Sequence, residues 1–216
     1  MNKKQIYSWA LYDWANSAFA TTVMAGFFPI FFSQYWSNPD NLSISTFYLG
    51  LGNSVASLIV ALLAPVLGAI ADRGSYKKKF LIFFAFLGIV MTLSLGFIAQ
   101  GMWPIALLVY IFSTIGFSGA NIFYDSLLPS VSDKKNVDYV SALGFSLGYL
   151  GGGILIIINF LMISYPATFG LVDAVEATKY SFISVGAWWS VFSIPLILFV
   201  DEPKFYQRES ISESVI

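Results

Sequence analysis

The stretch GAIADRGSYKKKF, residues 68–80, places five charged side chains between two long apolar segments. Gly68 would let a neighbouring helix approach closely, because glycine has no side chain. Asp72 and Arg73 end the preceding apolar segment, and Gly74 permits a sharp reversal of the chain. Three consecutive lysines follow, and short loops rich in lysine and arginine stay on the cytoplasmic side of a membrane. The stretch therefore indicates a tight cytoplasmic turn between two membrane-spanning helices, although any polytopic membrane protein can carry a basic inner loop.

The composition supports a membrane protein. Hydrophobic residues form 57% of the 216 residues and charged residues only 11%, whereas a soluble domain carries about 25% charged residues. The net charge of −1 excludes a nucleic-acid partner, since no basic field attracts phosphates. The absence of cysteine and histidine excludes disulfides, thiolate nucleophiles and the usual zinc sites. With no P-loop and no nucleophile elbow, we expect no enzyme, no cofactor and no metal site.

Six apolar segments of about 20 residues or more follow one another, and about 20 residues are needed to cross the hydrocarbon of a bilayer as a helix. The segments do not alternate in polarity, which argues against a β-barrel. We expect an all-α bundle of six transmembrane helices over residues 1–203 and a cytoplasmic tail over residues 204–216. The expected helices are Ser8–Ser33, Thr46–Ala71, Phe80–Ala99, Pro104–Leu128, Tyr139–Ile163 and Ser181–Val200.

The lysines and arginines predict the orientation of these helices. If the N-terminus lies in the cytoplasm and the spans alternate, ten of the eleven cationic residues lie inside and only Lys179 lies outside. We therefore expect a multi-pass protein with both termini in the cytoplasm, in the inner membrane if the chain is bacterial. The ten residues are Lys3, Lys4, Arg73, Lys77, Lys78, Lys79, Lys134, Lys135, Lys204 and Arg208.

The loop over residues 68–80 resembles the signature loop of the major facilitator superfamily, G-x-x-x-D-R-x-G-R-[RK], which lies between the second and third helices. Ser75 and Tyr76 stand where that pattern has its second glycine and an arginine. In the superfamily this loop latches the two halves of a transporter together on the cytoplasmic side. The residues that match are Gly68, Asp72, Arg73 and Lys77.

Four further stretches look like the vacuolar amino-acid effluxer branch of that superfamily: YDWANSAFATTV, FFPIFF, FYDSLLPSVSD and ALGFSLGYLGGG. The resemblance runs from about Ser8 to Pro203 and implies the N-terminal six-helix half of a facilitator fold, built as a 3+3 inverted repeat. A complete facilitator has two such halves. The expected partners are therefore the lipid bilayer, a small-molecule solute and a second six-helix half, whether a separate chain or a second copy.

Two acidic residues lie inside the apolar segments, each after a tyrosine, in Tyr12–Asp13 and Tyr124–Asp125. Ionisable residues within a membrane usually face a cavity or a partner. In the facilitator superfamily that this chain resembles, the first and fourth helices line the central cavity. The resemblance therefore implies candidates for a solute or proton site, which are Asp13, Asn16, Asn121, Tyr124 and Asp125. A structural role stays open for each, because an acid at a helix start is favoured by the dipole and asparagines often bond between helices.

At the C-terminal end of the fourth helix, however, the dipole disfavours Asp125, which therefore needs a nearby cation or water. Lys134, Lys135 and Arg73 are the candidate cations.

Gly144, Gly148 and Gly152 follow at intervals of four and so share one face of the fifth expected helix. Small residues at this spacing let helix backbones pack closely in lipid. We expect a packing face, with a sliding surface between helices as the functional alternative.

These observations favour a secondary transporter half that moves a small solute, with amino acids as the class implied by the resemblance, by alternating access. The alternative is a membrane subunit without transport of its own, or a truncated fragment of a split transporter.

Overall fold

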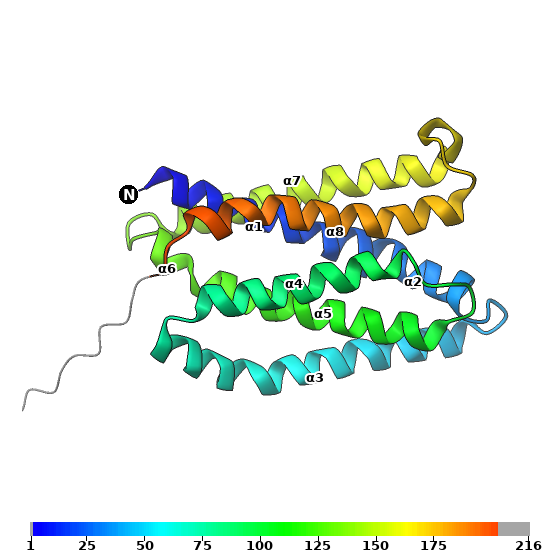
Figure 1. Ribbon diagram of the computed structural model, residues 1–216, viewed down its shortest axis with the longest axis horizontal. Helices are drawn as coiled ribbons and strands as arrows, with labels where there is room; N and C mark the ends of the chain where they lie inside the picture. Colours follow the sequence, from blue (N-terminus) through cyan, green and yellow to red (C-terminus); the bar gives the residue numbers. More distant parts are fainter. Residues whose placement is uncertain (1, 203–216) are drawn as a thin grey trace, which may run out of the picture.

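The computed structural model describes residues 2–202, and these residues form a bundle of long helices with no strand among them (Figure 1). The first membrane-spanning segment is Lys3–Trp36, and five further helices are also long and apolar enough to cross a bilayer. The expected all-α bundle of six spans is confirmed. The expected tail at residues 204–216, with Lys204 and Arg208, lies outside the described residues. The five further spans are α3 (Leu42–Gly74), α4 (Lys77–Leu95), α5 (Trp103–Ser126), α7 (Val137–Ser164) and α8 (Ala174–Phe199).

The first span changes its helical type in its middle. It begins as α1 (Lys3–Ala18), continues as a π-helix (Phe19–Phe27), passes through the short α2 (Phe28–Phe31) and ends in a second π-helix (Phe32–Trp36). In the first π-helix the hydrogen bonds reach five residues back, as in the bond from the Phe28 N–H to the carbonyl oxygen of Val23. Pi-helical segments are rare and frequently lie at functional sites.

Several helix ends differ from the expected bounds. The helix α8 begins at Ala174 rather than Ser181, because the Asp173 side chain accepts a hydrogen bond of 2.8 Å from the Glu176 N–H. The helix α4 ends at Leu95 rather than Ala99.

The turn between α3 and α4 corrects the expected role of Gly74. The left-handed residue there is Ser75, with φ of 52°, and not Gly74. A side chain at Gly74 would instead collide with the Tyr76 ring, so the glycine leaves room for that ring.

The packing of the spans relates two consecutive triplets in the sequence, the first span with α3 and α4, and α5 with α7 and α8. The first span packs against α7 and α8, α5 packs against α3 and α4, and α4 packs on α8. These pairings are unchanged when the first span is exchanged with α5, α3 with α7 and α4 with α8. Because each triplet has three spans, the second enters the membrane from the opposite side, as in an inverted repeat.

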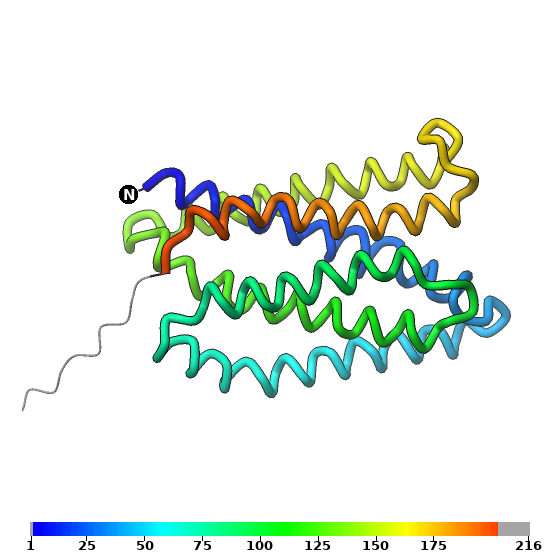
Figure 2. Tube along the Cα trace, in the orientation of Figure 1, coloured from blue at the N-terminus to red at the C-terminus, as the bar shows by residue number. Residues whose placement is uncertain are grey.

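The start of α1 and the end of α8 lie at the same end of the bundle (Figure 2). The α3–α4 turn and the short α6 (Leu128–Val131) also lie there (Figure 1). The connection from the first span to α3 and the 3-10 turn Pro166–Phe169 lie at the opposite end.

An aromatic core holds the first span in place. Phe28 stacks on Tyr110 of α5 with 4.0 Å between ring centroids, and Trp36 stacks on Phe182 of α8 at 5.8 Å. Half of the most apolar window of the first span is buried, against 11% for α3. The helix α3 is therefore the span least covered by the rest of the chain.

Candidate functional site

Three polar side chains follow one another along the first span, at intervals of four residues. The Ser17 hydroxyl donates a hydrogen bond of 2.9 Å to the Asp13 carboxylate, and the Thr21 hydroxyl donates to the carbonyl oxygen of Ser17 at 3.1 Å. The Thr21 hydroxyl also lies 3.3 Å from the carbonyl oxygen of Gly152 on α7. The row ends in the first π-helix, which begins at Phe19. We call Asp13, Ser17 and Thr21 the polar row.

The glycine face of α7 lies directly against this polar row. A Cβ atom at Gly148 would lie 2.7 Å from the Ser17 hydroxyl oxygen and 2.8 Å from the carboxyl carbon of Asp13. A Cβ atom at Gly152 would lie 2.9 Å from the Thr21 hydroxyl oxygen, and one at Gly144 would meet the Trp9 ring at 2.8 Å. The absence of side chains on this face is what lets the α7 backbone approach the polar row.

An open groove of about 210 Å³ follows the seam between the first span and α7. All three members of the polar row line it on one side, and Gly148 lies on the other. Phe145 and Tyr149 flank it and are largely exposed. A carboxylate next to hydroxyls and aromatic rings can bind an ammonium group or a proton, since an acid inside a membrane is stabilised by a cation or by protonation. The residues that line it are Asp13, Ser17, Ala20, Thr21, Phe145, Gly148 and Tyr149.

Asn16, Asn121 and Tyr124 lie between helices. The side-chain amide of Asn16 donates a hydrogen bond to the side-chain oxygen of Asn121 and so joins α1 to α5. Tyr124 is buried and stacks on Trp9, with 4.3 Å between ring centroids. The Trp9 indole N–H donates a bond of 3.1 Å to the carbonyl oxygen of Tyr124. Asn16 is 1% exposed. These contacts give Asn16 and Tyr124 packing partners, and neither residue lines the open groove.

Asp125 is exposed near the end of α5. The expected counter-cations do not pair with it. Within residues 2–202, neither Lys134, Lys135 nor Arg73 forms an ion pair with this carboxylate. Asp13 lines the open groove and Asp125 does not.

Most of the chain matches a known family of membrane proteins. Residues 40–215 match the family model described as "Vacuole effluxer Atg22 like". The chain belongs to the Atg22-like effluxer family. It is 41% identical to the uncharacterized MFS-type transporter YxiO of Bacillus subtilis over 208 residues, which cover 95% of this chain and 49% of that protein. It is 20% identical to autophagy-related protein 22 of Eremothecium gossypii, over 92% of this chain and 46% of that protein. The expected facilitator superfamily and its effluxer branch are confirmed.

An uncharacterized protein of Aquifex aeolicus is 26% identical over 98% of this chain and 50% of its own length. The chain therefore spans about half the length of these curated relatives. The family is one of transporters, which agrees with the expectation that the chain is not an enzyme.

The signature loop of this Atg22-like chain is held by contacts within the chain. The Lys77 ammonium pairs with the Asp72 carboxylate at 2.8 Å. Arg73 lies in the last turn of α3 and is exposed. A Cβ atom at Gly68 would meet no other atom within 4 Å, so no helix among the described residues uses the close approach that this glycine permits.

A carboxylate that the sequence did not single out also holds this loop. The two side-chain oxygens of Glu202 accept hydrogen bonds from the backbone N–H groups of Lys77 and Lys78, at 2.8 and 3.1 Å. The Lys78 ammonium donates to the carbonyl oxygen of Val200 at 2.6 Å. The end of α8 is thus tied to the start of α4.

Ser17 and Thr21 are the other residues that the sequence did not single out. Their spacing from Asp13 was a usable signal, because positions four apart share a helix face. Hydroxyl side chains in helices commonly bond to their own backbone, however, so spacing alone does not distinguish a site from local bonding.

Proposed function

We propose that the chain forms one six-helix half of a secondary transporter, which moves a small solute across a membrane by alternating access against a second half. The observation that carries the proposal is the polar row of Asp13, Ser17 and Thr21, which faces an open groove beside a π-helix. Transporter sites lie near the middle of the bilayer, where a span departs from regular α-helix and frees backbone groups. An acid is costly in hydrocarbon and persists where it meets a cation or a water-filled path.

Amino acids are the proposed solute class. The resemblance to vacuolar amino-acid effluxers supports this class, and the groove offers a carboxylate for the ammonium group of an amino acid. Asp125 is proposed to lie on the same solute or proton path, because it is a second acid inside an apolar span. No residue on the groove selects one amino-acid side chain over another.

The proposed setting is a cytoplasmic membrane with both termini inside. The distribution of lysine and arginine supports this orientation. The second half is proposed to be a separate six-helix segment in the same orientation, because the halves of a facilitator are related by an axis along the membrane normal.

The test is transport of radiolabelled amino acids into vesicles from cells that express the chain together with a second half, the part of YxiO that it does not match, with Asp13→Asn as the variant. This change keeps the side-chain volume and removes the charge, so uptake or efflux should fall at least tenfold while the protein stays folded in the membrane. Asp40→Asn is the matched control, because Asp40 is an exposed acid in the loop before α3. Normal transport by Asp13→Asn across a range of pH would show that this carboxylate has a structural role only.

A further inference from the structure

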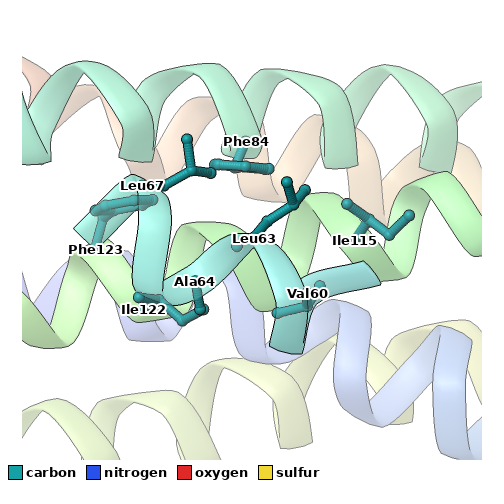
Figure 3. A pocket seen from close by; sticks show the side chains of 9 residues that line it. Val60, Leu63, Ala64, Leu67, Phe84, Ile115, Ile122 and Phe123 are labelled. Carbon is teal, nitrogen blue, oxygen red and sulfur yellow. The ribbon is translucent and has the colours of Figure 1, made fainter. Parts of the chain in front are cut away.

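A second cavity lies between α3 and α4, away from the α1–α7 groove. It is open, has a volume of about 310 Å³, and is lined by Leu67, Phe80, Phe83, Phe84 and Lys79. A narrow crevice between α3, α4 and α5 continues from it, since Leu67 and Phe84 line both (Figure 3). We call the two together the α3–α4 groove.

The α3–α4 groove is apolar along its length and charged only at one end. Figure 3 shows hydrocarbon side chains from α3, α4 and α5 pointing into the crevice, among them Leu63, Ile115 and Ile122. From Leu67 to Val60 it follows α3 for about 10 Å, at 1.5 Å per residue. The crevice itself holds only about 10 Å³. The open cavity along Leu67, Phe83 and Phe84 is therefore the part that can take acyl carbons.

Lys79 supplies the charge, and it differs from the two lysines before it. The Lys77 ammonium is paired with Asp72, and the Lys78 ammonium donates to the carbonyl oxygen of Val200. The Lys79 ammonium lies over the Tyr76 ring, 4.7 Å from its centroid, and within residues 2–202 it forms no ion pair with a carboxylate. Of these three lysines, Lys79 alone lines the open cavity and has its positive charge available to an anion.

We propose that the α3–α4 groove binds an anionic phospholipid, with one acyl chain along Leu67, Phe83 and Phe84 and the phosphate on the Lys79 ammonium. Lys79 lies in the first turn of a membrane span, at the depth where lipid phosphates meet a protein. An apolar groove that runs from a cation toward the membrane centre matches both parts of such a lipid. This site is independent of the solute groove, because the two share no lining residue.

The test is native mass spectrometry of the full chain in detergent, titrated with dioleoyl phosphatidylglycerol or dioleoyl phosphatidylcholine. The anionic lipid should be retained about fivefold more tightly, which is the effect of one basic residue near a charged lipid surface. Lys79→Gln should abolish this preference. Leu67→Phe should weaken retention of both lipids, since it fills the junction of cavity and crevice without changing the charge.

Lys134→Gln is the matched control, because Lys134 is exposed near the same end of the bundle and does not line the groove. It should keep the preference. Equal retention of the two lipids by the unmodified chain, a preference that survives Lys79→Gln, or an equal loss in Lys134→Gln would each overturn the proposal. Displacement of the anionic lipid by inorganic phosphate alone would also overturn it, since the site would then take free phosphate rather than lipid.

Discussion

At the residue scale, the glycines of α7 are not equivalent. Gly148 lies against Asp13 and Ser17, so any side chain there must displace the carboxylate or its hydroxyl partner. Gly153 lies on the same helix, yet a Cβ atom there would meet nothing within 4 Å. The two positions therefore separate the effect of crowding the polar row from the effect of changing the helix itself.

We predict that Gly148→Val destabilises the chain by about 1–3 kcal/mol, as overpacking of a close contact does, and lowers transport strongly. The reason is that the added isopropyl group would force Asp13 away from Ser17. Thermal unfolding in detergent micelles measures the first effect, and uptake into vesicles that contain this chain together with a second half measures the other. Gly153→Val introduces the same β-branched side chain, with the same change in helix propensity, at a position where it meets no other atoms. The stability and transport of this variant should therefore remain near those of the unmodified chain. Equal losses in both variants would contradict this prediction.

The sequence predicted some of these residues and not others, for a physical reason. Asp13 and the glycines could be found because an acid and a run of glycines are unusual in an apolar helix. The hydrogen bond between Ser17 and Asp13 could not be predicted, because serine and threonine hydroxyls in helices commonly donate to backbone carbonyl groups instead. Whether Asn16 faced a cavity or another helix also depended on how far the first span is rotated about its own axis, which apolar spacing alone left undetermined.

At the scale of elements, α4 receives its N-terminal cap from the other end of the chain. Its N-cap residue, Tyr76, makes no capping bond with its side chain, and Glu202 accepts the N–H groups of Lys77 and Lys78 instead. Unsatisfied N–H groups at a helix start favour a negative charge. Glu202 therefore connects the third and sixth spans at the end of the bundle where α1 begins.

We predict that Glu202→Ala lowers the free energy of unfolding by about 1–2 kcal/mol, the size of a lost helix cap with its charge. Hydrogen exchange at the amides of Lys77 and Lys78 should rise, because both lose their acceptor. Asp40→Ala removes an exposed acid at the opposite end of the bundle and should change neither quantity. Unchanged exchange at these two amides in Glu202→Ala would contradict the role of this carboxylate.

The existence of the six spans was predictable and their irregularities were not. The bilayer requires about 20 apolar residues for each span, so hydropathy locates them. The early start of α8 was missed because Asp173 and Glu176 are polar, although together they form a helix start. The π-helices in the first span were missed because they depend on the contacts of the whole segment, such as the stacking of Phe28 on Tyr110.

At the scale of the whole molecule, the proposed orientation rests on the distribution of lysine and arginine. We predict that Ser43→Cys and Ala174→Cys react with a membrane-impermeant thiol reagent in intact cells, whereas Lys134→Cys does not. Ser43 and Ala174 belong to the first turns of α3 and α8, which lie at the end of the bundle opposite the start of α1, and Lys134 follows α6, which lies at the same end as the start of α1. The native chain has no cysteine, so the background is low. Labelling of Lys134→Cys from outside would reverse the proposed orientation.

The helix α3 is mostly uncovered, the α1–α7 groove is open, and the chain matches about half the length of its relatives. A groove that carries an acid is costly where it faces hydrocarbon, so a second half that covers it would lower that cost. Both halves of a facilitator share one orientation in the membrane, which lets a separately expressed segment dock.

We therefore expect the chain to purify together with the half of YxiO that it does not match, in equal numbers of the two chains, when both are expressed in one cell. Vesicles with both halves should take up amino acids at a saturable rate, and vesicles with this chain alone should not, because alternating access needs two halves that rock about one site. The Asp13→Asn variant of the pair is the control for a site within this chain, since it should still assemble but lose transport. Saturable transport by a monomer would refute the requirement for a partner, whereas transport by a dimer of this chain would show that a second copy takes the place of the other half.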